Sequence, residues 1–345
     1  MTKLPKISVV LTSFNHEKYI REAIESALNQ TFTDFELIIW DDASQDNSWE
    51  VICSYSDPRI KTFRNDVQRR GIYGINKAIT EVAQGEYIAI HHSDDVWEPE
   101  KLEKQVAFLD EHPEAGAVFT WAQIIDENGT HLPNNWFIQE NKTRWQWLRL
   151  LFDNENHLNH PSVLIRKKCY EDVGLYRLGL AQTGDAEMWS RLLLKYPIHV
   201  LQESLTKHRL FSNKSNTSGD RPEVRIRTEN EWNILRQNFL KLQSFDEVSN
   251  IFPEVLSYCT EEGCNSKFLL AMACLRASNQ RSAWQLGLSW LFELLCAPVS
   301  RKEIEDLYSF TYLDYINLTE KYDVFALAQL AEKDAQLAEK DAQLA

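Results

Sequence analysis

Two adjacent carboxylates, Asp94 and Asp95, end an apolar stretch that begins at Tyr87 and is typical of a buried strand. In open α/β sheets, ligands bind at the carboxyl ends of parallel strands. Neighbouring carboxylates repel each other, so they lie side by side at low cost only on a solvated surface or around a cation. A solvated turn is the simpler interpretation of the pair. Because it ends a strand, we favour a cation site.

A second acidic pair, Asp41 and Asp42, follows another apolar run, Phe35 to Trp40. A helix is expected directly afterwards, with Asp46 or Ser48 as its N-cap. This pattern indicates a second strand and helix unit with an acidic strand end. Both pairs can therefore contribute to one site at the carboxyl edge of a sheet.

A third candidate, Asp185, stands at the start of an amphipathic helix, after the loop Gln182 to Gly184. Asp is a common N-cap residue, so capping alone is one interpretation of this position. The other is a general base, a role that suits a single carboxylate in a loop away from a metal. Glu187, two residues further on, is the next candidate for such a base.

Four tryptophans between residues 121 and 147 could stack on sugar rings. Aromatic rings offer large apolar faces, but packing against the core or a helix is the more frequent use of such side chains. We therefore expect packing for most of Trp121, Trp136, Trp145 and Trp147.

The elements that must position these residues alternate along the chain. Apolar, β-rich runs predict strands at residues 7–11, 35–40, 59–63 and from residue 87. Helical spacing predicts helices between them, because parallel strands need crossover connections. We therefore expect an α/β fold, a mainly parallel sheet flanked by helices. Later strands are expected at 117–125 and 160–166, with two short closing strands at 198–201 and 205–209.

Composition restricts the class of protein. The 345 residues are 43% hydrophobic and 26% charged, enough for a sizeable core in about two domains. The formal net charge of -14 argues against a nucleic-acid partner, because phosphate contacts need clustered cations. The six cysteines form no CxxC pair or Cys/His cluster, which indicates reduced thiols. No secretory signal or membrane span is recognised, so we expect a cytoplasmic protein, soluble or peripheral at the inner face of the membrane.

The second part of the chain has a different pattern. The polar run Ser212 to Gly219 indicates a linker between a domain of residues 1–215 and a helical extension of residues 220–326. Residues 327–345 repeat Ala-Gln-Leu-Ala-Glu-Lys-Asp with a seven-residue period. Lys333 and Asp334 occupy the seam positions after Leu330, so we expect an exposed helix rather than a coiled coil. Oligomerisation through the C-terminal helices stays an alternative.

Several motifs, in order along the first 215 residues or so, resemble those of family 2 glycosyltransferases. They are Ile7–Asn15, Ala27–Thr31, Glu36–Ser44, Asn76, Gly85–Ile88, Ser93–Asp95, His160–Val163 and Gly184–Trp189. An ordered set is far more specific than any single motif. The resemblance implies a GT-A domain over residues 1–215 and an inverting transfer of a sugar from a nucleotide-sugar, expected to be a UDP-sugar, to an acceptor hydroxyl.

The resemblance also implies partners and roles for individual residues. It implies a divalent cation, Mn²⁺ or Mg²⁺, and a glycan, lipid-linked or protein acceptor in polysaccharide or glycoconjugate synthesis. By position, Asp185 would be the catalytic base and Asp94 the metal ligand, while Asp42 would hold the uracil or its ribose. The residues that it places around the nucleotide-sugar are Thr12, Phe14, Asn15, Asp41, Asp42, Asn76, His92, Ser93 and Asp95.

The chemistry of such a transfer fits these residue types. Cleavage of a glycosyl phosphate leaves a diphosphate, whose charge a divalent cation on Asp94 can neutralise. Inversion needs one carboxylate to deprotonate the incoming hydroxyl, which suits Asp185. A retaining route through a covalent intermediate needs a second carboxylate at the sugar, and the sequence offers no distinct candidate.

Two positions depart from the family pattern. His92 stands where the family often has an Asp, and Phe211 stands where it has a His that can complete the metal site. These changes leave one alternative function, a catalytically degenerate nucleotide-binding or scaffold protein that acts through its helical C-terminal region. A sugar-nucleotide pyrophosphorylase is disfavoured, because the loop Thr12 to Asn15 lacks the glycine that close approach to phosphate needs.

Overall fold

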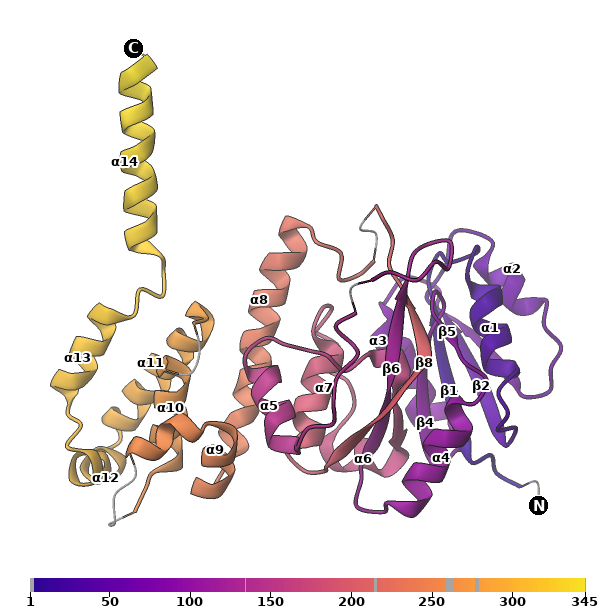
Figure 1. The fold of residues 1–345 in the computed structure, drawn as a ribbon, viewed down its shortest axis with the longest axis horizontal. Helices are drawn as coiled ribbons and strands as arrows, with labels where there is room; N and C mark the ends of the chain where they lie inside the picture. The colour runs from indigo at the N-terminus through magenta and orange to yellow at the C-terminus, as the bar shows by residue number, and fades with distance from the viewer. Residues whose placement is uncertain (1–2, 134, 214–215, 259–262, 277–278, 345) are drawn as a thin grey trace. The chain divides into compact units, whose positions relative to one another are not determined.

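The structure, a computed structural model, describes residues 3–133, 135–213, 216–258, 263–276 and 279–344. In these ranges the strands form one eight-stranded sheet with the order β3-β2-β1-β4-β7-β6-β8-β5. The strands are β1 Ile7–Ser13, β2 Phe35–Asp41, β3 Ile60–Arg64, β4 Tyr87–His92, β5 Val96–Trp97, β6 Ala117–Ile125, β7 Leu164–Arg166 and β8 Ile198–Arg209. Figure 1 shows β6 and β8 as two long neighbouring strands.

The sheet is mixed, with a parallel half and a less regular half. Strands β3, β2, β1 and β4 are parallel, and β7 is antiparallel to both β4 and β6. Strand β8 runs parallel to β6, and the short β5 pairs antiparallel with β8. The predicted α/β sheet with flanking helices is confirmed. The two closing strands expected at 198–201 and 205–209 are wrong, because β8 is continuous across them and a register shift beside Trp121 accommodates the polar residues between.

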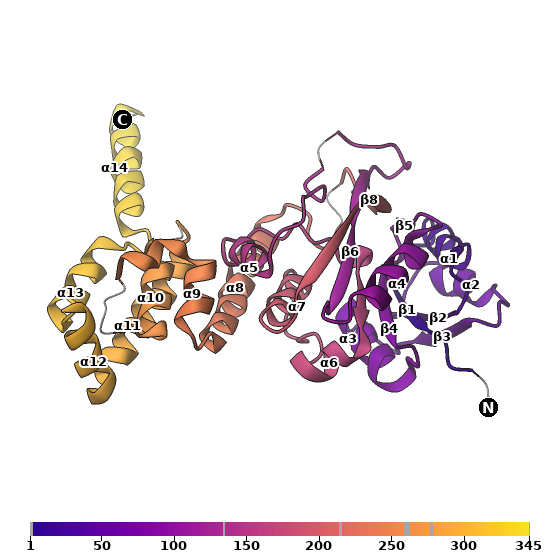
Figure 2. The same ribbon diagram turned by 60° about the horizontal axis from the view of Figure 1, so that its bottom comes forward.

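Helices cover both faces of this sheet (Figures 1 and 2). Helices α1, α2 and α4 lie on one face, where Val9 and Leu11 of β1 belong to one buried cluster with Ile24 and Leu102. Since alternate residues of a strand point to opposite faces, Val10 faces the other side, where α3 packs against β1. Helix α7 also lies on that side, because its Trp189 contacts Phe119 of β6 edge to face. The bounds are α1 Ile20–Leu28, α2 Ser48–Cys53, α3 Gly71–Lys77, α4 Lys101–Glu111, α5 Arg144–Phe152, α6 Lys167–Val173 and α7 Gly184–Leu193.

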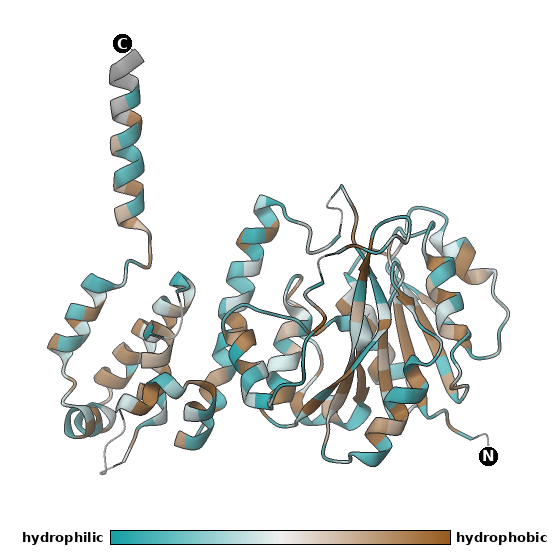
Figure 3. Cartoon of the chain, in the orientation of Figure 1, coloured by the Kyte–Doolittle hydropathy of each residue, from teal (hydrophilic) through white to brown (hydrophobic). Residues whose placement is uncertain are grey.

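The chain divides into two compact units, residues 1–231 and 232–345. The second unit is helical, and α8 contains the boundary. Helix α8, Pro222–Arg236, lies mostly in the first unit and ends in the second. The helices that follow are α9 Phe245–Ile251, α10 Ser266–Arg276, α11 Arg281–Cys296, α12 Pro298–Tyr308, α13 Tyr312–Lys321 and α14 Leu327–Leu344. In Figure 3 the strands of the sheet are largely hydrophobic, whereas the coloured part of α14 mixes hydrophilic and hydrophobic residues. Leu330 and Leu337 of α14 are exposed.

The predicted linker at 212–219 is only partly described, since residues 214 and 215 lie outside the described ranges. Within the described part, the Asn216 side chain accepts the Phe211 N–H and donates to the Arg209 carbonyl oxygen, so this end of the run is held against the end of β8. The proposed domain limits at 215 and 327 stay predictions. Among the described helices, none is long and apolar enough to cross a membrane.

Candidate active site

The strand register brings the predicted site residues to one edge of the sheet. Thr12 of β1 is level with Trp40 of β2 and with His92 of β4. Ser13 is level with Asp41. The two acidic strand ends therefore flank the end of β1, as parallel pairing requires.

Asp42 shapes the loop that follows β3. It is 3% exposed, and its carboxylate accepts hydrogen bonds from the Asn65 side chain (2.7 Å) and from the backbone N–H groups of Arg69 (2.8 Å) and Arg70 (2.7 Å). Arg70 has a φ of 73°, a left-handed conformation that costs a side-chain-bearing residue energy and needs such support. Three of the carboxylate's roughly four acceptor positions are thus used.

Asp41 and Asn15 connect the ends of β1 and β2. Asp41 is fully buried and accepts the Ser44 hydroxyl at 2.6 Å and its N–H at 2.9 Å. The Ser44 hydroxyl oxygen in turn accepts the Asn15 N–H, and the Asn15 side chain accepts the N–H of Gln45. The exposed Asn15, the half-buried Thr12 and Phe14, and the loop after Asp41 therefore border one another.

Ser13 lies in the loop that the resemblance places at the nucleotide, but sequence reasoning gave its side chain no role of its own. Its hydroxyl is buried at the end of β1 and has no hydrogen-bond partner among the described residues. An unpartnered buried hydroxyl costs free energy, so such a group at a strand end is suited to a bound polar ligand. Only the position of Ser13 beside Thr12 and Phe14 could have drawn attention to it.

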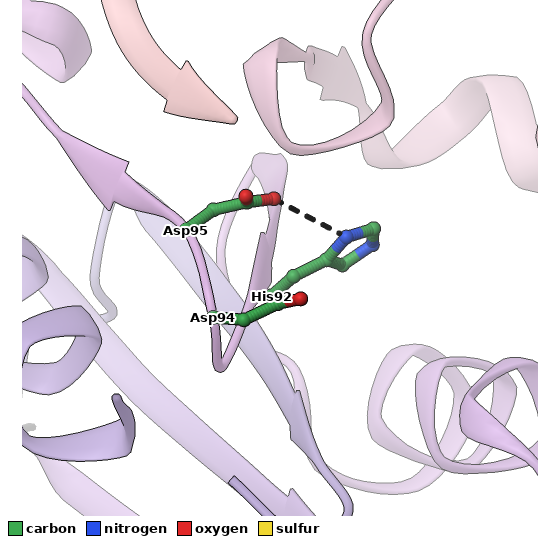
Figure 4. Close-up of side chains that lie close together, drawn as sticks. All are labelled: His92, Asp94 and Asp95. Atoms are coloured by element: carbon green, nitrogen blue, oxygen red, sulfur yellow. Dashed lines mark ion pairs between the residues drawn. The ribbon is translucent and has the colours of Figure 1, made fainter. Parts of the chain in front are cut away.

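The central cluster consists of His92, Asp94 and Asp95, each of which offers one ligand atom within 4.8 Å of the others (Figure 4). His92 Nδ1 lies 3.5 Å from an oxygen of Asp95. Two further imidazoles approach the same carboxylates. His208 Nδ1 of β8 is 3.2 Å from Asp95, and His16 Nε2 is 4.0 Å from Asp94 while its Nδ1 bonds the Ser93 hydroxyl at 2.8 Å.

The two carboxylates have opposite pKa shifts. Burial raises the pKa of Asp94, and the neighbouring Asp95 raises it further. Burial alone would raise the pKa of Asp95, but the imidazoles of His208 and His92 hold it well below its usual range. In return, the carboxylates raise the pKa of His208 against the effect of its burial. Asp95 is therefore the ionised partner of two imidazoles, and Asp94 is the half-buried carboxylate available to a ligand.

The donor set fits a divalent cation. Two carboxylate oxygens and an imidazole nitrogen suit Mn²⁺, whereas Mg²⁺ prefers oxygen donors alone. His92 is thus a competent donor in the place where an Asp was expected. Phe211 cannot supply an imidazole to the carboxylates. His208, three residues earlier in the chain, does so.

Arg209 fixes the position of both carboxylates from β8. Its backbone N–H donates to Asp95 at 2.8 Å, and its buried guanidinium donates to the backbone carbonyl of Asp94 at 2.8 Å. The same guanidinium also bonds Glu22 of α1 at 2.7 Å. The acidic turn after β4 is therefore held by a strand more than a hundred residues away in sequence.

Asp185 is the second residue of α7, and the N-cap position belongs to Thr183. Capping is therefore the wrong interpretation of Asp185. Its carboxylate is half-buried and accepts hydrogen bonds from the Asn156 side chain (2.9 Å) and from the N–H of Ala186 (2.7 Å). Burial raises the pKa of Asp185, while the hydrogen bonds from Ala186 and Asn156 act in the opposite direction.

Glu187 has a different environment, although it lies in the same helical turn. It is fully buried and forms a two-pronged ion pair with Arg191, at 2.8 and 2.9 Å, and Arg177 approaches it at 3.2 Å. The Arg191 guanidinium also donates to backbone carbonyls at residues 173–175. Through Arg191, Glu187 therefore stabilises the segment before α7. This structural role disfavours Glu187 as a base.

Asn76 bonds the backbone of Tyr176, in the same segment before α7. Its side chain donates to the Tyr176 carbonyl at 2.8 Å and accepts the Tyr176 N–H at 3.2 Å. The Tyr176 hydroxyl bonds His160, which in turn bonds His92 at 3.2 Å. Burial lowers the pKa of His160, so it is neutral in this chain of contacts.

The four tryptophans differ in how exposed their side chains are. Trp147 is buried and Trp121 and Trp145 are half-buried, in agreement with packing, whereas Trp136 is 43% exposed. The Trp136 carbonyl bonds His157, the neighbour of Asn156, and the adjacent Phe137 contacts His208 edge to face. The segment around Trp136 therefore contacts His157, next to the Asn156 that bonds Asp185, and His208, which approaches Asp95.

Comparison with known proteins gives a consistent assignment. The family model described as glycosyl transferase family 2 matches residues 8–174. Over 211 residues the chain is 32% identical to an uncharacterised glycosyltransferase of Methanocaldococcus jannaschii. The aligned part covers 60% of this chain and 71% of the relative. Over 212 residues it is 30% identical to the putative teichuronic acid biosynthesis glycosyltransferase TuaG of Bacillus subtilis, covering 61% and 81%.

The fold agrees with a solved structure. The chain is similar to residues 1–349 of S. aureus TarS in complex with UDP-GlcNAc, with a TM-score of 0.59, 18% sequence identity, and coverage of 88% of this chain and 89% of that TarS chain. At that identity the similarity concerns the fold alone. The expected GT-A type of fold is confirmed.

The raised pKa of Asp185 predicts a pH-dependent difference in stability between the wild type and Asp185→Asn. Between the ordinary and the raised pKa, the folded state binds more protons than the unfolded state, so wild-type stability falls as pH rises through this interval. The Asn variant lacks this loss. Urea unfolding of both proteins in EDTA, from pH 4 to pH 8, should show the variant gaining in relative stability and then levelling off. A difference that does not vary with pH would contradict the buried carboxyl group.

Proposed function

Because this chain belongs to glycosyl transferase family 2, we propose that it transfers a sugar from a UDP-sugar to an acceptor hydroxyl with inversion of the anomeric carbon. The observation that carries this proposal is the environment of Asp185. This carboxylate is hydrogen-bonded to a neutral amide and to a backbone N–H, and burial raises its pKa. A carboxylate of raised pKa is a stronger general base than an ordinary one.

The reaction requires one proton acceptor and one stabilised leaving group. Asp185 takes the proton of the acceptor hydroxyl as its oxygen attacks the anomeric carbon. The bond from that carbon to the phosphate oxygen breaks, and UDP leaves with the electron pair. Attack from the face opposite the leaving group gives the inverted glycoside, with the proton on Asp185.

Asp94, with Asp95 and His92, would hold the divalent cation, which supplies charge neutralisation at the diphosphate when bound. We propose Mn²⁺ over Mg²⁺ because the donor set includes nitrogen. The buried contacts of Arg209 support this role, since they fix the turn that carries both carboxylates.

The nucleotide is proposed to lie at the ends of β1 and β2, beside Thr12, Phe14, Asn15 and the Asp41–Asp42 pair. The unpartnered hydroxyl of Ser13 supports a polar ligand there. Asp42 retains about one acceptor position, which suits a single hydrogen bond from the uracil N–H or a ribose hydroxyl. Asn76 acts indirectly, through the backbone of Tyr176.

The acceptor is proposed to be a glycan in polysaccharide or glycoconjugate synthesis. The similarity to TuaG supports this class of acceptor. The exposed Trp136 independently supports a glycan acceptor. Its carbonyl bonds His157, the neighbour of Asn156, and the adjacent Phe137 contacts His208. An aromatic face in that place can pack against a sugar ring.

Donor binding should depend on the metal. UDP with Mn²⁺ is expected to raise the melting temperature, because a ligand that binds only the folded state stabilises it. The shift should be larger than with UDP in excess EDTA, and Asp94→Asn should lose the difference. An identical UDP shift in Mn²⁺ and in EDTA would contradict the metal site and assign the diphosphate to imidazole or basic side chains.

Asp185→Asn is expected to reduce the transfer rate by about 10²- to 10⁴-fold, since the amide cannot accept the proton. Donor affinity, measured by calorimetry with UDP and Mn²⁺, should stay close to that of the wild type. Asp94→Asn is the matched comparison, because there donor affinity itself should fall. Retention of most of the transfer rate in Asp185→Asn would exclude it as the base.

Trp136→Ala is expected to raise the KM for a glycan acceptor several-fold, because an aromatic contact of this kind contributes roughly 1 kcal/mol. The KM for the donor should not change, and Trp136→Phe should lose less. Trp145→Ala on α5 is the matched control, since that tryptophan is half-buried and packs with Arg144. Equal effects of the two alanine variants would contradict an acceptor contact.

A further inference from the structure

Glu231, near the C-terminal end of α8, is buried against the loop that leads into α7. It is 4% exposed. One carboxylate oxygen accepts the N–H of Ala181 at 2.8 Å, and the other accepts those of Gln182 at 2.7 Å and Thr183 at 2.8 Å. The Thr183 hydroxyl adds a longer contact of 3.3 Å. Three consecutive backbone donors thus converge on one side chain.

These contacts hold the loop directly before α7, at a helix start where the N-cap side chain makes no capping bond. The first N–H groups of a helix have no partner within the helix, and an N-cap side chain normally satisfies one of them. Thr183 occupies the N-cap position but makes no side-chain capping bond. Glu231, from a different helix, accepts the N–H of Thr183 and those of the two loop residues before it. Its negative charge at this end also suits the helix dipole.

The loop that Glu231 holds delivers Asp185. Only Gly184 separates Thr183 from Asp185, and the Asp185 carboxylate depends on this backbone for its contact with Asn156. Charge-assisted hydrogen bonds are stronger than neutral ones, so three of them restrict the loop tightly. A displacement of about 1 Å at a reacting group can reduce a rate by about 10²-fold.

We propose that Glu231 is a positioning residue for the general base, and this inference rests on the proposed role of Asp185. Glu231 lies beyond residue 174, where the family match ends, and beyond residue 215, the predicted end of the transferase domain. The start of the helical region therefore contributes to the geometry of transfer.

The test uses the full chain with Glu231→Gln. The amide keeps one acceptor oxygen but turns an NH₂ group toward backbone donors, so the loop loses part of its support. The expected result is a kcat about 10- to 100-fold lower, with the donor KM within about threefold of the wild type, in line with the cost of misplacing a reacting group. Glu223→Gln is the matched control on the same helix, because Glu223 is exposed and pairs only at the surface with Arg221. It should behave as wild type.

A double-mutant cycle separates positioning from general damage. If Glu231 acts through Asp185, Glu231→Gln should have little further effect on the residual transfer of Asp185→Asn, whereas independent effects would multiply. Multiplying effects, or an unchanged kcat in Glu231→Gln, would overturn the inference. A wild-type rate in Asp185→Asn would instead overturn the proposed base.

Thr183→Val provides a second test if Glu231→Gln folds poorly. It removes only the hydroxyl contact to Glu231 and leaves the three backbone bonds in place. A loss of kcat of a few-fold that disappears in the Asp185→Asn background is expected. A loss that persists in that background would contradict positioning through Asp185.

Discussion

The buried negative charge of Asp95 determines how the site is assembled. A fully buried carboxylate is tolerated only with hydrogen bonds and opposite charges around it. Asp95 obtains them from the N–H of Arg209 and from the imidazoles of His92 and His208. Two of these three groups belong to the end of β8, so satisfying Asp95 fixes that strand end beside the turn after β4. Asp94 is positioned by the same contact, since Arg209 also holds its carbonyl oxygen.

Sequence reasoning found the parts of the site that carry a local signature. The strands beginning at Ile7, Phe35 and Tyr87, and the two acidic pairs after them, follow from apolar runs with a polar end. Asp185 came from a motif, and its place on α7 agrees. The structure adds His16, Asn156 and His208, which reach the carboxylates from distant segments. No pattern marks His16 or Asn156, and the family pattern at residues 208–211 draws attention to Phe211 rather than to His208. The roles of all three depend on tertiary contacts.

Asp185 and Glu187 show why environment, rather than residue type, assigns the roles. The two carboxylates are two residues apart on one helix, yet Glu187 is neutralised by Arg191 and Asp185 is bonded to an amide. Burial raises the pKa of Asp185, so it is a stronger proton acceptor than an ordinary carboxylate. The sequence offered both as bases, and the arginine contact distinguishes them.

The loop that carries the base is held at both of its ends. At its start, Asn76 of α3 bonds the backbone of Tyr176, and at its finish Glu231 of α8 bonds the backbone of Ala181 to Thr183. Helix α3 begins at Gly71, directly after Arg70, whose N–H is held by Asp42.

A continuous series of contacts therefore runs from the proposed nucleotide loop, through α3, to the proposed base. Each connection in this series is a hydrogen bond or a stretch of helix, so contacts link the loop held by Asp42 to the loop before Asp185. The family match ends at residue 174, before Glu231. The site therefore cannot be understood from the matched residues alone.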